Sequence, residues 1–424
     1  MNKIKKYLSL KSNFYGYLLT LFSILVMFVF ALAVSPLNET INGLINIAIT
    51  NDNLISDYVV IGGLGGAFLN AALVTLIALI TVFLSGADIT GPVIAGLFTV
   101  AGFAFFGKDI TNILPIFIGV YLNSIFQKQP YKQNIVAALF GTTMSPIISA
   151  VMLYPDINPI LSIFLGIMIG LFVGFILPFV AKLAFKIHNG FNLYNIGFSS
   201  GLILMIIVSF LKVIGFKVTP VLLWSNGNDL IMSLFLASIY LILLVLAYFD
   251  SRNPYSNIVK LNKEAGIAPS DFYLGYGVAN TFVNMALIGI ISHLYILLFN
   301  VPLNGPTIGG VLTIVAFGAY GKNVRNVSFI LIGAALGHFI GLWNMTTPAI
   351  ILGALFGTGI APIAGKYGLL VGTLGIMLHI SLVQNVGALY LGLNLYNNGF
   401  AEGFTGFMIP AVVNGIYKIK EEAK

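Results

Sequence analysis

The sequence predicts an all-α polytopic membrane protein made of two inverted-topology repeats, each with about seven apolar segments, some of them re-entrant. Of its 424 residues, 58% are hydrophobic and only 8% are charged, whereas an ordinary soluble domain has roughly 25% charged residues. Apolar runs near the length of about 20 residues that a bilayer core requires recur along the whole chain. The second observation is that the two halves of the chain repeat one another in order.

Fourteen apolar segments account for most of the chain. We place them at about 15–35, 57–84, 90–106, 110–126, 134–152, 159–185, 197–214, 229–249, 273–299, 304–320, 327–343, 347–364, 367–385 and 399–416. The resulting regions are a cytoplasmic N-terminus (1–14), membrane repeat 1 (15–214), a connecting loop (215–228), membrane repeat 2 (229–416, with a cytoplasmic loop at 250–272) and a cytoplasmic tail (417–424).

The basic residues indicate which side of the membrane each loop faces. If the N-terminus is cytoplasmic and every segment crosses, the inside loops receive all of the 20 basic residues except Lys108, Lys212 and Lys217. An excess of Lys and Arg inside is what the positive-inside rule expects. We therefore predict a multi-pass protein of the inner (cytoplasmic) membrane with both termini cytoplasmic. The net charge of +7 then needs no nucleic-acid partner.

The internal repeat matches glycine, proline, asparagine and lysine residues as well as apolar ones. Four pairs of blocks recur in order: Gly91-Pro92 and Gly305-Pro306, Gly107-Lys108 and Gly321-Lys322, Ala138-Leu-Phe-Gly-Thr142 and Ala354-Leu-Phe-Gly-Thr358, and Asn192-Leu-Tyr-Asn195 and Asn394-Leu-Tyr-Asn397. Because each half has an odd number of segments, the second copy is upside down relative to the first. Inverted repeats are typical of transporters, whose solute site lies near the midplane where the halves meet.

Interrupted helices occur inside a bilayer only where they are buried in protein or line a wet cavity. The Gly-Pro pairs that follow Thr90 and Asn304 open the third and tenth segments. They are consistent with half-helices whose free N–H groups face the pathway, and equally with ordinary helix starts. Thr142 and Thr358 each precede a proline inside a short segment. There we favour a kink that lines the pathway over packing alone.

The repeated Asn-Leu-Tyr-Asn element is the best candidate for solute binding, because asparagine offers donors and an acceptor without charge. Its members are Asn192, Tyr194 and Asn195, and Asn394, Tyr396 and Asn397. The alternative is turn chemistry, which does not require two asparagines and a tyrosine in both copies. Asn70 and Asn284 occupy matching mid-membrane positions. They either line the site or join helices by hydrogen bonds.

Ionisable residues inside a membrane are costly and usually functional. Glu402 lies well inside an apolar run, where the first copy has Ser200. We predict that it couples transport to a proton or cation, with a helix-capping or surface role as the alternative. His338 and His379 also lie within segments, and each is more often a satisfied core histidine than a proton relay.

Several classes of protein are disfavoured. There is no cysteine, so disulfides, thiolate metal sites and cysteine nucleophiles are excluded. No phosphate loop or metal-ligand cluster occurs, which argues against an ATP-driven pump and against a cofactor. The G-x-S-x-G pattern around Ser199 is not kept in the second copy, as expected if the glycines serve packing rather than hydrolysis.

The tandem blocks, above all the repeated Asn-Leu-Tyr-Asn-x-Gly-Phe element, resemble an uncharacterised bacterial membrane family known only as a domain of unknown function. Tyr194-Asn195 and Tyr396-Asn397, each followed by a glycine, are also similar to the Tyr-Asn-Gly element of urea transporters, with one residue inserted. That resemblance implies a neutral amide-like solute. Seven plus seven segments with Gly-Pro pairs at segments three and ten also resemble nucleobase and anion transporters.

The sequence therefore predicts a secondary transporter or facilitator of a small polar solute, not an enzyme, with its site at the interface of the repeats. The alternative is a selective channel for a small neutral solute or an ion, and an intramembrane hydrolase is a distant third. The expected partners are the solute and membrane lipid, without nucleic acid, and a homo-oligomer is left open.

Overall fold

The computed structural model describes residues 3–51, 55–219 and 221–422. Over this part of the chain it contains helices and two isolated β-bridges but no strand. Nine of its helices, broken ones included, are long and apolar enough to cross a membrane. The predicted fold class, an all-α polytopic membrane protein, is confirmed.

The helices follow the predicted apolar segments. Repeat 1 contains α1 (Lys3–Ala33), α2 (Leu37–Ala48), α3 (Tyr58–Ser85), α4 (Gly91–Phe103), α5 (Leu114–Phe126), α6 (Ile135–Gly141), α7 (Ser145–Met152), α8 (Pro159–His188) and α9 (Asn195–Val213). Repeat 2 contains α10 (Asp229–Asp250), α11 (Ile258–Lys263), α12 (Phe272–Tyr276), α13 (Val278–Leu298), α14 (Gly305–Phe317), α15 (Val324–Phe339), α16 (Pro348–Phe356), α17 (Ala361–Tyr367), α18 (Leu369–Val386) and α19 (Asn397–Glu422). Short 3-10 helices lie at Tyr131–Gln133, Thr142–Met144, Gly357–Ile360 and Gly387–Tyr390.

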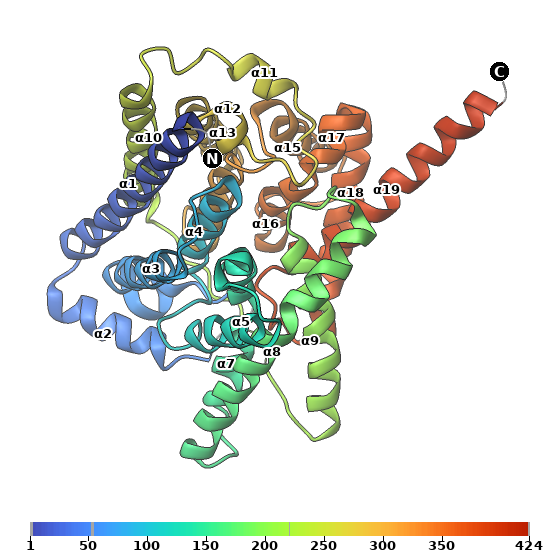
Figure 1. Cartoon of the computed structure of the whole chain (residues 1–424). Helices are drawn as coiled ribbons and strands as arrows, with labels where there is room; N and C mark the ends of the chain where they lie inside the picture. The colour runs from blue at the N-terminus through green and yellow to red at the C-terminus, as the bar shows by residue number, and fades with distance from the viewer. Residues whose placement is uncertain (1–2, 52–54, 220, 423–424) are drawn as a thin grey trace.

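Helix α2 is an addition that the apolar segments did not predict. It is only 12 residues long, too short to span a bilayer. One face packs on α3, where a Cβ at Gly43 would lie 2.0 Å from the carbonyl oxygen of Gly62. The other face exposes Leu37, Ile41 and Ile45. In Figure 1, α2 lies along the outer edge of α3, where this apolar face is free to contact lipid.

The two repeats complete one another through reciprocal contacts at the starts of α4 and α14. A carboxylate oxygen of Asp57 accepts from the N–H of Gly305 at 3.2 Å, and Asp271 accepts from the N–H of Gly91 at 3.1 and 3.2 Å. A Cβ at Gly91 would lie 2.2 Å from the backbone oxygen of Ala319, so no larger residue fits. Two matched contacts of this kind relate the repeats by a pseudo-two-fold axis.

Helices α4 and α14 form the centre of the molecule. Each has 13 residues and is therefore about 20 Å long, shorter than the roughly 30 Å hydrocarbon core. They cross in close contact at glycine, since a Cβ at Gly102 would lie 3.0 Å from the Cα of Gly309. Nearly every residue of both helices is buried. Helix α4 packs against α3 and α6, and α14 packs against α13 and α16; Figure 1 shows α4 near the middle of the molecule.

Asn70 and Asn284 hydrogen bond to the backbone at and just beyond the C-terminal ends of the same two helices. The Asn70 side-chain amide donates to the carbonyls of Ala104 and Lys108, both at 2.8 Å. The Asn284 amide donates to the carbonyls of Gly318 and Lys322 at 2.9 and 2.8 Å. The carbonyls of Ala104 and Gly318 end the two helices, where no further turn supplies a partner, and those of Lys108 and Lys322 lie in the loops that follow. Both asparagines therefore join helices by hydrogen bonds, which was one of the two predicted roles.

The inverted topology predicts that repeat-related loops lie on opposite sides of the membrane. Because the natural chain has no cysteine, single cysteines can be introduced into it directly. We expect Lys128→Cys, after α5, to react with a membrane-impermeant maleimide only from the cytoplasmic side, and Asn344→Cys, after α15, only from outside. Both positions are exposed. Labelling of both from one side in intact cells would contradict the inversion.

Candidate functional site

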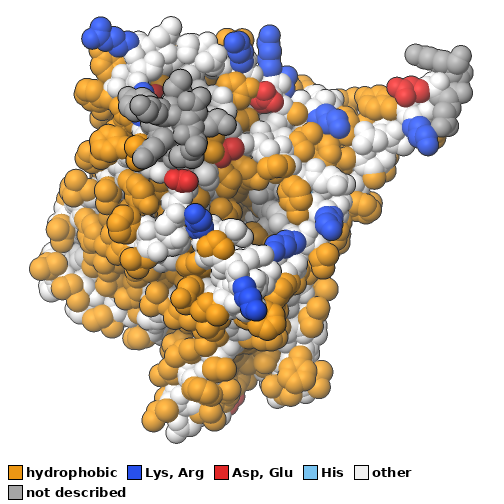
Figure 2. Space-filling model, viewed as in Figure 1, with side chains coloured by type: hydrophobic (Ala, Val, Ile, Leu, Met, Phe, Trp, Pro, Cys, Tyr) orange, Lys and Arg blue, Asp and Glu red, His pale blue; other side chains and the backbone are white. Residues whose placement is uncertain are grey.

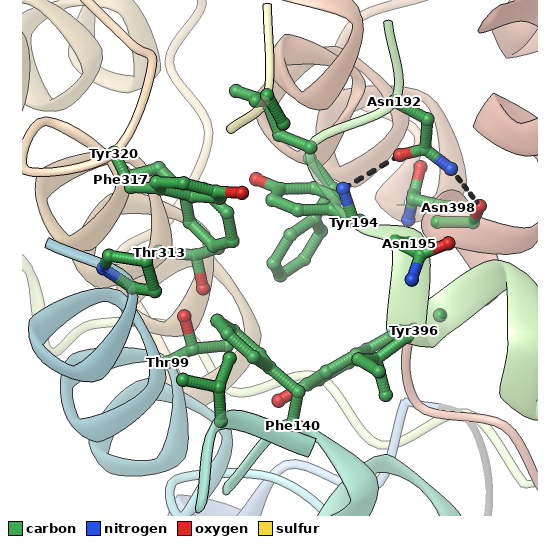
Figure 3. A pocket seen from close by; sticks show the side chains of 18 of the residues that line it. Thr99, Phe140, Asn192, Tyr194, Asn195, Thr313, Phe317, Tyr320, Tyr396 and Asn398 are labelled. Atoms are coloured by element: carbon green, nitrogen blue, oxygen red, sulfur yellow. Dashed lines mark hydrogen bonds between the residues drawn. The ribbon is translucent and has the colours of Figure 1, made fainter. Parts of the chain in front are cut away.

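A cavity lies between the repeats, with about 740 Å³ of space free of protein atoms, part of it open to the surface. Most of its wall consists of repeat-related pairs, so the cavity lies on the pseudo-two-fold axis. The pairs are Thr99 and Thr313, Phe103 and Phe317, Phe140 and Phe356, Leu193 and Leu395, Tyr194 and Tyr396, and Gly197 and Gly399. Figure 3 shows the hydroxyl groups of Thr99 and Thr313 turned toward one another on one side of the cavity.

The cavity opens on one face of the protein, which we call the basic face. This face carries the loop between α10 and α12 and the side chains of Lys182, Lys186, Lys263, Arg325 and Lys366. A second hollow, lined by Lys182 and Lys186, shares Phe185 and Asn195 with the cavity wall. Figure 2 shows a hollow with Lys and Arg side chains around it. Tyr320 lines the cavity near this opening.

Aromatic rings close the opposite side of the cavity. Phe106, the repeat counterpart of Tyr320, is fully buried and stacks on Phe103 with ring centroids 4.6 Å apart. Phe103 also contacts the rings of Tyr396 and Phe356, at 4.6 and 5.1 Å. The two repeats therefore differ at one matched position: the side chain lines the open cavity in repeat 2 and is packed away in repeat 1.

Two lysines are fully buried behind the cavity wall. Lys108 and Lys322 follow α4 and α14, and neither side chain has any solvent exposure. The count of basic residues by loop placed Lys108 outside and Lys322 inside and treated both side chains as solvated. Their burial shows that the assumption of solvation was wrong. The repeated Gly-Lys block was the signal that could have identified them, because a lysine retained at matched positions in both repeats is more than a topology determinant.

Each buried lysine contacts the tyrosine of the other repeat. The Lys108 ammonium donates to the Tyr396 hydroxyl at 2.6 Å and lies 4.6 Å from the centre of its ring. The Lys322 ammonium donates to the Tyr194 hydroxyl at 2.5 Å and lies 4.6 Å from that ring. Cation–π attraction is strongest where water is excluded. The two tyrosines thus connect the cavity wall to the buried charges.

The two lysine sites are not equivalent. Lys322 also donates to the hydroxyl of Thr358 at 2.6 Å, and it interacts electrostatically with Glu402. Glu402 is fully buried on α19, with its carboxyl group against the backbone of Gly359. No side chain in the described residues hydrogen bonds to either carboxylate oxygen. Repeat 1 has Ser200 at this place, so its lysine has no such carboxylate.

The Asn-Leu-Tyr-Asn elements meet across the pseudo-axis, as predicted. Asn192 donates to the carbonyl of Gly399 at 3.0 Å, and Asn394 donates to that of Gly197 at 3.3 Å. Figure 3 shows Asn192 also accepting from the N–H of Tyr194, at 2.7 Å. Asn192 thus has both ends of its amide engaged by the protein, while its side chain still lines the cavity.

The second asparagine of each element is also bound within the protein. The amides of Asn195 and Asn397 donate to the carbonyls of Ala181 and Val383, both at 3.1 Å. Their oxygens contact His188 and Tyr390 respectively. Asn195 lines the cavity, whereas Asn394 and Asn397 lie behind its wall. Asn398, which was not predicted, lines the cavity and bonds to His379 at 3.0 Å.

Thr142, Thr358, Thr90 and Asn304 do not line the cavity, whereas Pro92 of the first Gly-Pro start does. The hydroxyls of Thr142 and Thr358 each donate to a carbonyl of the preceding turn at 2.7 Å. Thr90 precedes α4 without a side-chain cap, while Asn304 caps α14 by accepting from Thr307. Because Asp271 and Asp57 occupy the first N–H groups of these helices, the N–H groups are not free for a solute. The ordinary helix start is the better description.

The remaining residues singled out in the sequence, His338 and Ser199, do not line the cavity. His338 contacts the backbone oxygen of Trp343 at 3.0 Å, outside the cavity. The Ser199 hydroxyl is buried and donates to the carbonyl of Asn195 at 2.8 Å. Among the described residues, no group of three or more His, Cys, Asp or Glu side chains could hold a metal ion.

The fold and the cavity together define the chain as a polytopic membrane protein of two interlocked repeats with a cavity between them. The chain belongs to the family described as "Protein of unknown function (DUF1576)", whose model matches residues 37–213 and 251–415. The resemblance to an uncharacterised family with a tandem repeat is therefore confirmed. A search of curated proteins found no match. A search of solved structures also found none.

The different surroundings of the two lysines predict different costs for losing the tyrosine hydroxyl. Tyr396→Phe removes the acceptor of Lys108, and an unsatisfied buried donor costs about 1–3 kcal/mol. Tyr194→Phe leaves Lys322 with Thr358, so we expect it to destabilise the protein less. Thermal unfolding of the purified protein in detergent measures both, with the exposed Tyr255→Phe as control. Equal destabilisation by the two cavity variants would contradict the assigned asymmetry.

Proposed function

We propose that this protein is a secondary transporter that carries a small polar solute across the cytoplasmic membrane by alternating access. The observation that supports this most is the cavity between the repeats, lined by matched residues of both and partly open to the surface. Inverted-repeat transporters bind solute at this place and expose it to each side in turn. The positive-inside rule favours a cytoplasmic basic face, and we therefore assign the open cavity to an inward-open state.

The matched pair Tyr320 and Phe106 supports exchange between two states. When the repeats exchange conformations, Phe106 takes the place that Tyr320 has now and lines an opening on the other side. Tyr320 then packs against Phe317, as Phe106 now packs against Phe103. Because a pseudo-two-fold axis relates the repeats, an exchange of their conformations gives an outward-open state with equivalent contacts. The two states therefore have similar energies.

The wall of the cavity supports a small solute with both polar and apolar parts. Thr99, Thr313, Asn192 and Asn398 contribute hydroxyl and amide groups, while phenylalanine and tyrosine rings cover much of the remainder. Among the described residues, no charged side chain lines the cavity. Specificity then comes from hydrogen bonds and from the shape of the aromatic wall.

Alternating access predicts opposite accessibility at the matched aromatic positions. We expect Tyr320→Cys to react with a membrane-impermeant thiol reagent only from the cytoplasmic side. Phe106→Cys should react only from outside, more slowly, because it is buried in the inward-open state. In a carrier the two openings exclude one another, so modification of Tyr320→Cys with a bulky reagent should protect Phe106→Cys in the double variant.

The comparison uses inside-out and right-side-out vesicles, with exposed Lys260→Cys as a control for orientation. If both cysteines react at full rate in the same molecules, the protein is a channel. If Phe106→Cys never reacts, the cavity does not alternate and the transporter proposal fails.

A further inference from the structure

We propose that Glu402, connected to the cavity through Lys322 and Tyr194, is the proton-binding site that couples the two access states to a proton gradient. This inference rests on the proposed function. It assigns the coupling ion as a proton and gives roles to Lys322, Tyr194 and Thr358 that the repeat pattern alone did not suggest.

The first support is the environment of the carboxyl group. Glu402 is fully buried, and no side-chain donor satisfies its oxygens. An ionised carboxylate in such a place is costly unless a positive charge is close. The charge that acts on it is Lys322, and the pair lies beyond 4.0 Å, outside direct ion-pair contact. Both the ionised and the protonated forms are therefore accessible, as a reversible proton site requires.

The second support is a continuous route from the cavity to this carboxyl group. Tyr194 lines the cavity, and its hydroxyl accepts from the Lys322 ammonium at 2.5 Å. Thr358 holds the same ammonium from another direction at 2.6 Å. When Glu402 is ionised, Lys322 passes it a proton through an intervening water, because the two side chains are not in direct contact, and regains one from cavity water through the Tyr194 hydroxyl. The net change is one proton lost by the cavity water and one gained by Glu402.

The third support is the asymmetry between the repeats. Lys108 and Tyr396 reproduce the lysine–tyrosine contact in repeat 1, but Ser200 stands where repeat 2 has Glu402. The carboxylate nearest Lys108 in sequence, Asp109, is bound instead by Thr111 and by the N–H and side chain of Asn112. Of the two lysines, only Lys322 is therefore linked to a buried acid that no side chain in the described residues binds.

The other titratable groups near Glu402 are accounted for. The helices and 3-10 helices packed against α19 include α8, α9, α16, α17, α18 and Gly357–Ile360. Their titratable side chains, with those of the adjoining segments, are Lys182, Lys186, His188, Tyr194, Lys212, Lys366, Tyr367, His379 and Tyr390, of which Lys182 and Lys186 are exposed. His188 and His379 bond to Asn195 and Asn398, and Lys366 is exposed. Lys322 and Tyr194 are the groups that interact electrostatically with Glu402.

Protonation of Glu402 removes the attraction between its carboxylate and Lys322 on the open side of the cavity. In the ionised state, the carboxylate attracts Lys322 and so links α19 to the Tyr194 wall. In the protonated state, Lys322 is held by Tyr194 and Thr358 alone. A state that loses an attraction on protonation is disfavoured relative to its alternative at low pH. Acidification therefore moves the protein from the inward-open toward the outward-open state.

The test follows the two access states as a function of pH, using the labelling rates of Phe106→Cys and Tyr320→Cys. Each rate is divided by that of exposed Lys260→Cys, so that the thiolate fraction cancels. A two-state equilibrium linked to one proton shifts by up to about tenfold per pH unit. We expect the ratio of Phe106→Cys to Tyr320→Cys labelling to rise at least about threefold from about pH 8 to about pH 6.

Glu402→Gln should abolish this pH dependence, whereas Glu421→Gln, an exposed site on the same helix, and Ser200→Ala, its repeat counterpart, should retain it. In the unsubstituted chain, infrared difference spectra between the two pH values should show a buried carboxyl band that Glu402→Gln lacks. A ratio independent of pH in the chain with Glu402, or pH dependence retained by Glu402→Gln, would overturn the inference. Absence of any Phe106→Cys labelling would instead refute alternating access itself.

Discussion

The structure depends on the requirement that backbone N–H and C=O groups buried in a membrane find partners within the protein. Helices α4 and α14 are too short to reach both bilayer surfaces, where water would satisfy the groups at their ends. Their starts are satisfied by Asp271 and Asp57, each from the other repeat, and their ends by Asn70 and Asn284. Neither repeat can complete its central helix alone. The two halves are therefore folded as one unit, and the cavity exists only where they meet.

The repeat blocks predicted this arrangement because they preserve residues that the central helices need. Gly91-Pro92 and Gly305-Pro306 mark the helix starts, and the Asn-Leu-Tyr-Asn elements meet across the axis as expected. The wrong placement was that of Lys108 and Lys322. Charge counting assumes that a lysine between apolar segments is solvated, but Tyr396 and Tyr194 cover these two. Such covering comes from residues nearly 300 and about 130 positions away, which local sequence cannot indicate.

The predicted solute-binding asparagines show a second limit of sequence reasoning. An amide repeated in both halves predicts that it makes important hydrogen bonds, but not with what. The amides of Asn192, Asn394, Asn195 and Asn397 all donate to backbone carbonyls, as buried polar groups generally do. The hydroxyls of Thr99 and Thr313 also donate to backbone carbonyls, those of Ala95 and Gly309, so what these two threonines offer a solute is the acceptor capacity of their oxygens. These sit within uniformly apolar runs and carry no distinguishing pattern.

The glycine contact between α4 and α14 has a mechanical consequence. Where Gly102 faces Gly309, two smooth backbones touch without interdigitated side chains, so the crossing resists a small rocking rotation less than a knobs-into-holes interface does. Phe103 directly follows Gly102, and the Phe106 ring packs against Gly309, so a rotation at this crossing moves these two rings with it. This contact can therefore act as a pivot at the centre of the protein, about which the two repeats rotate relative to one another.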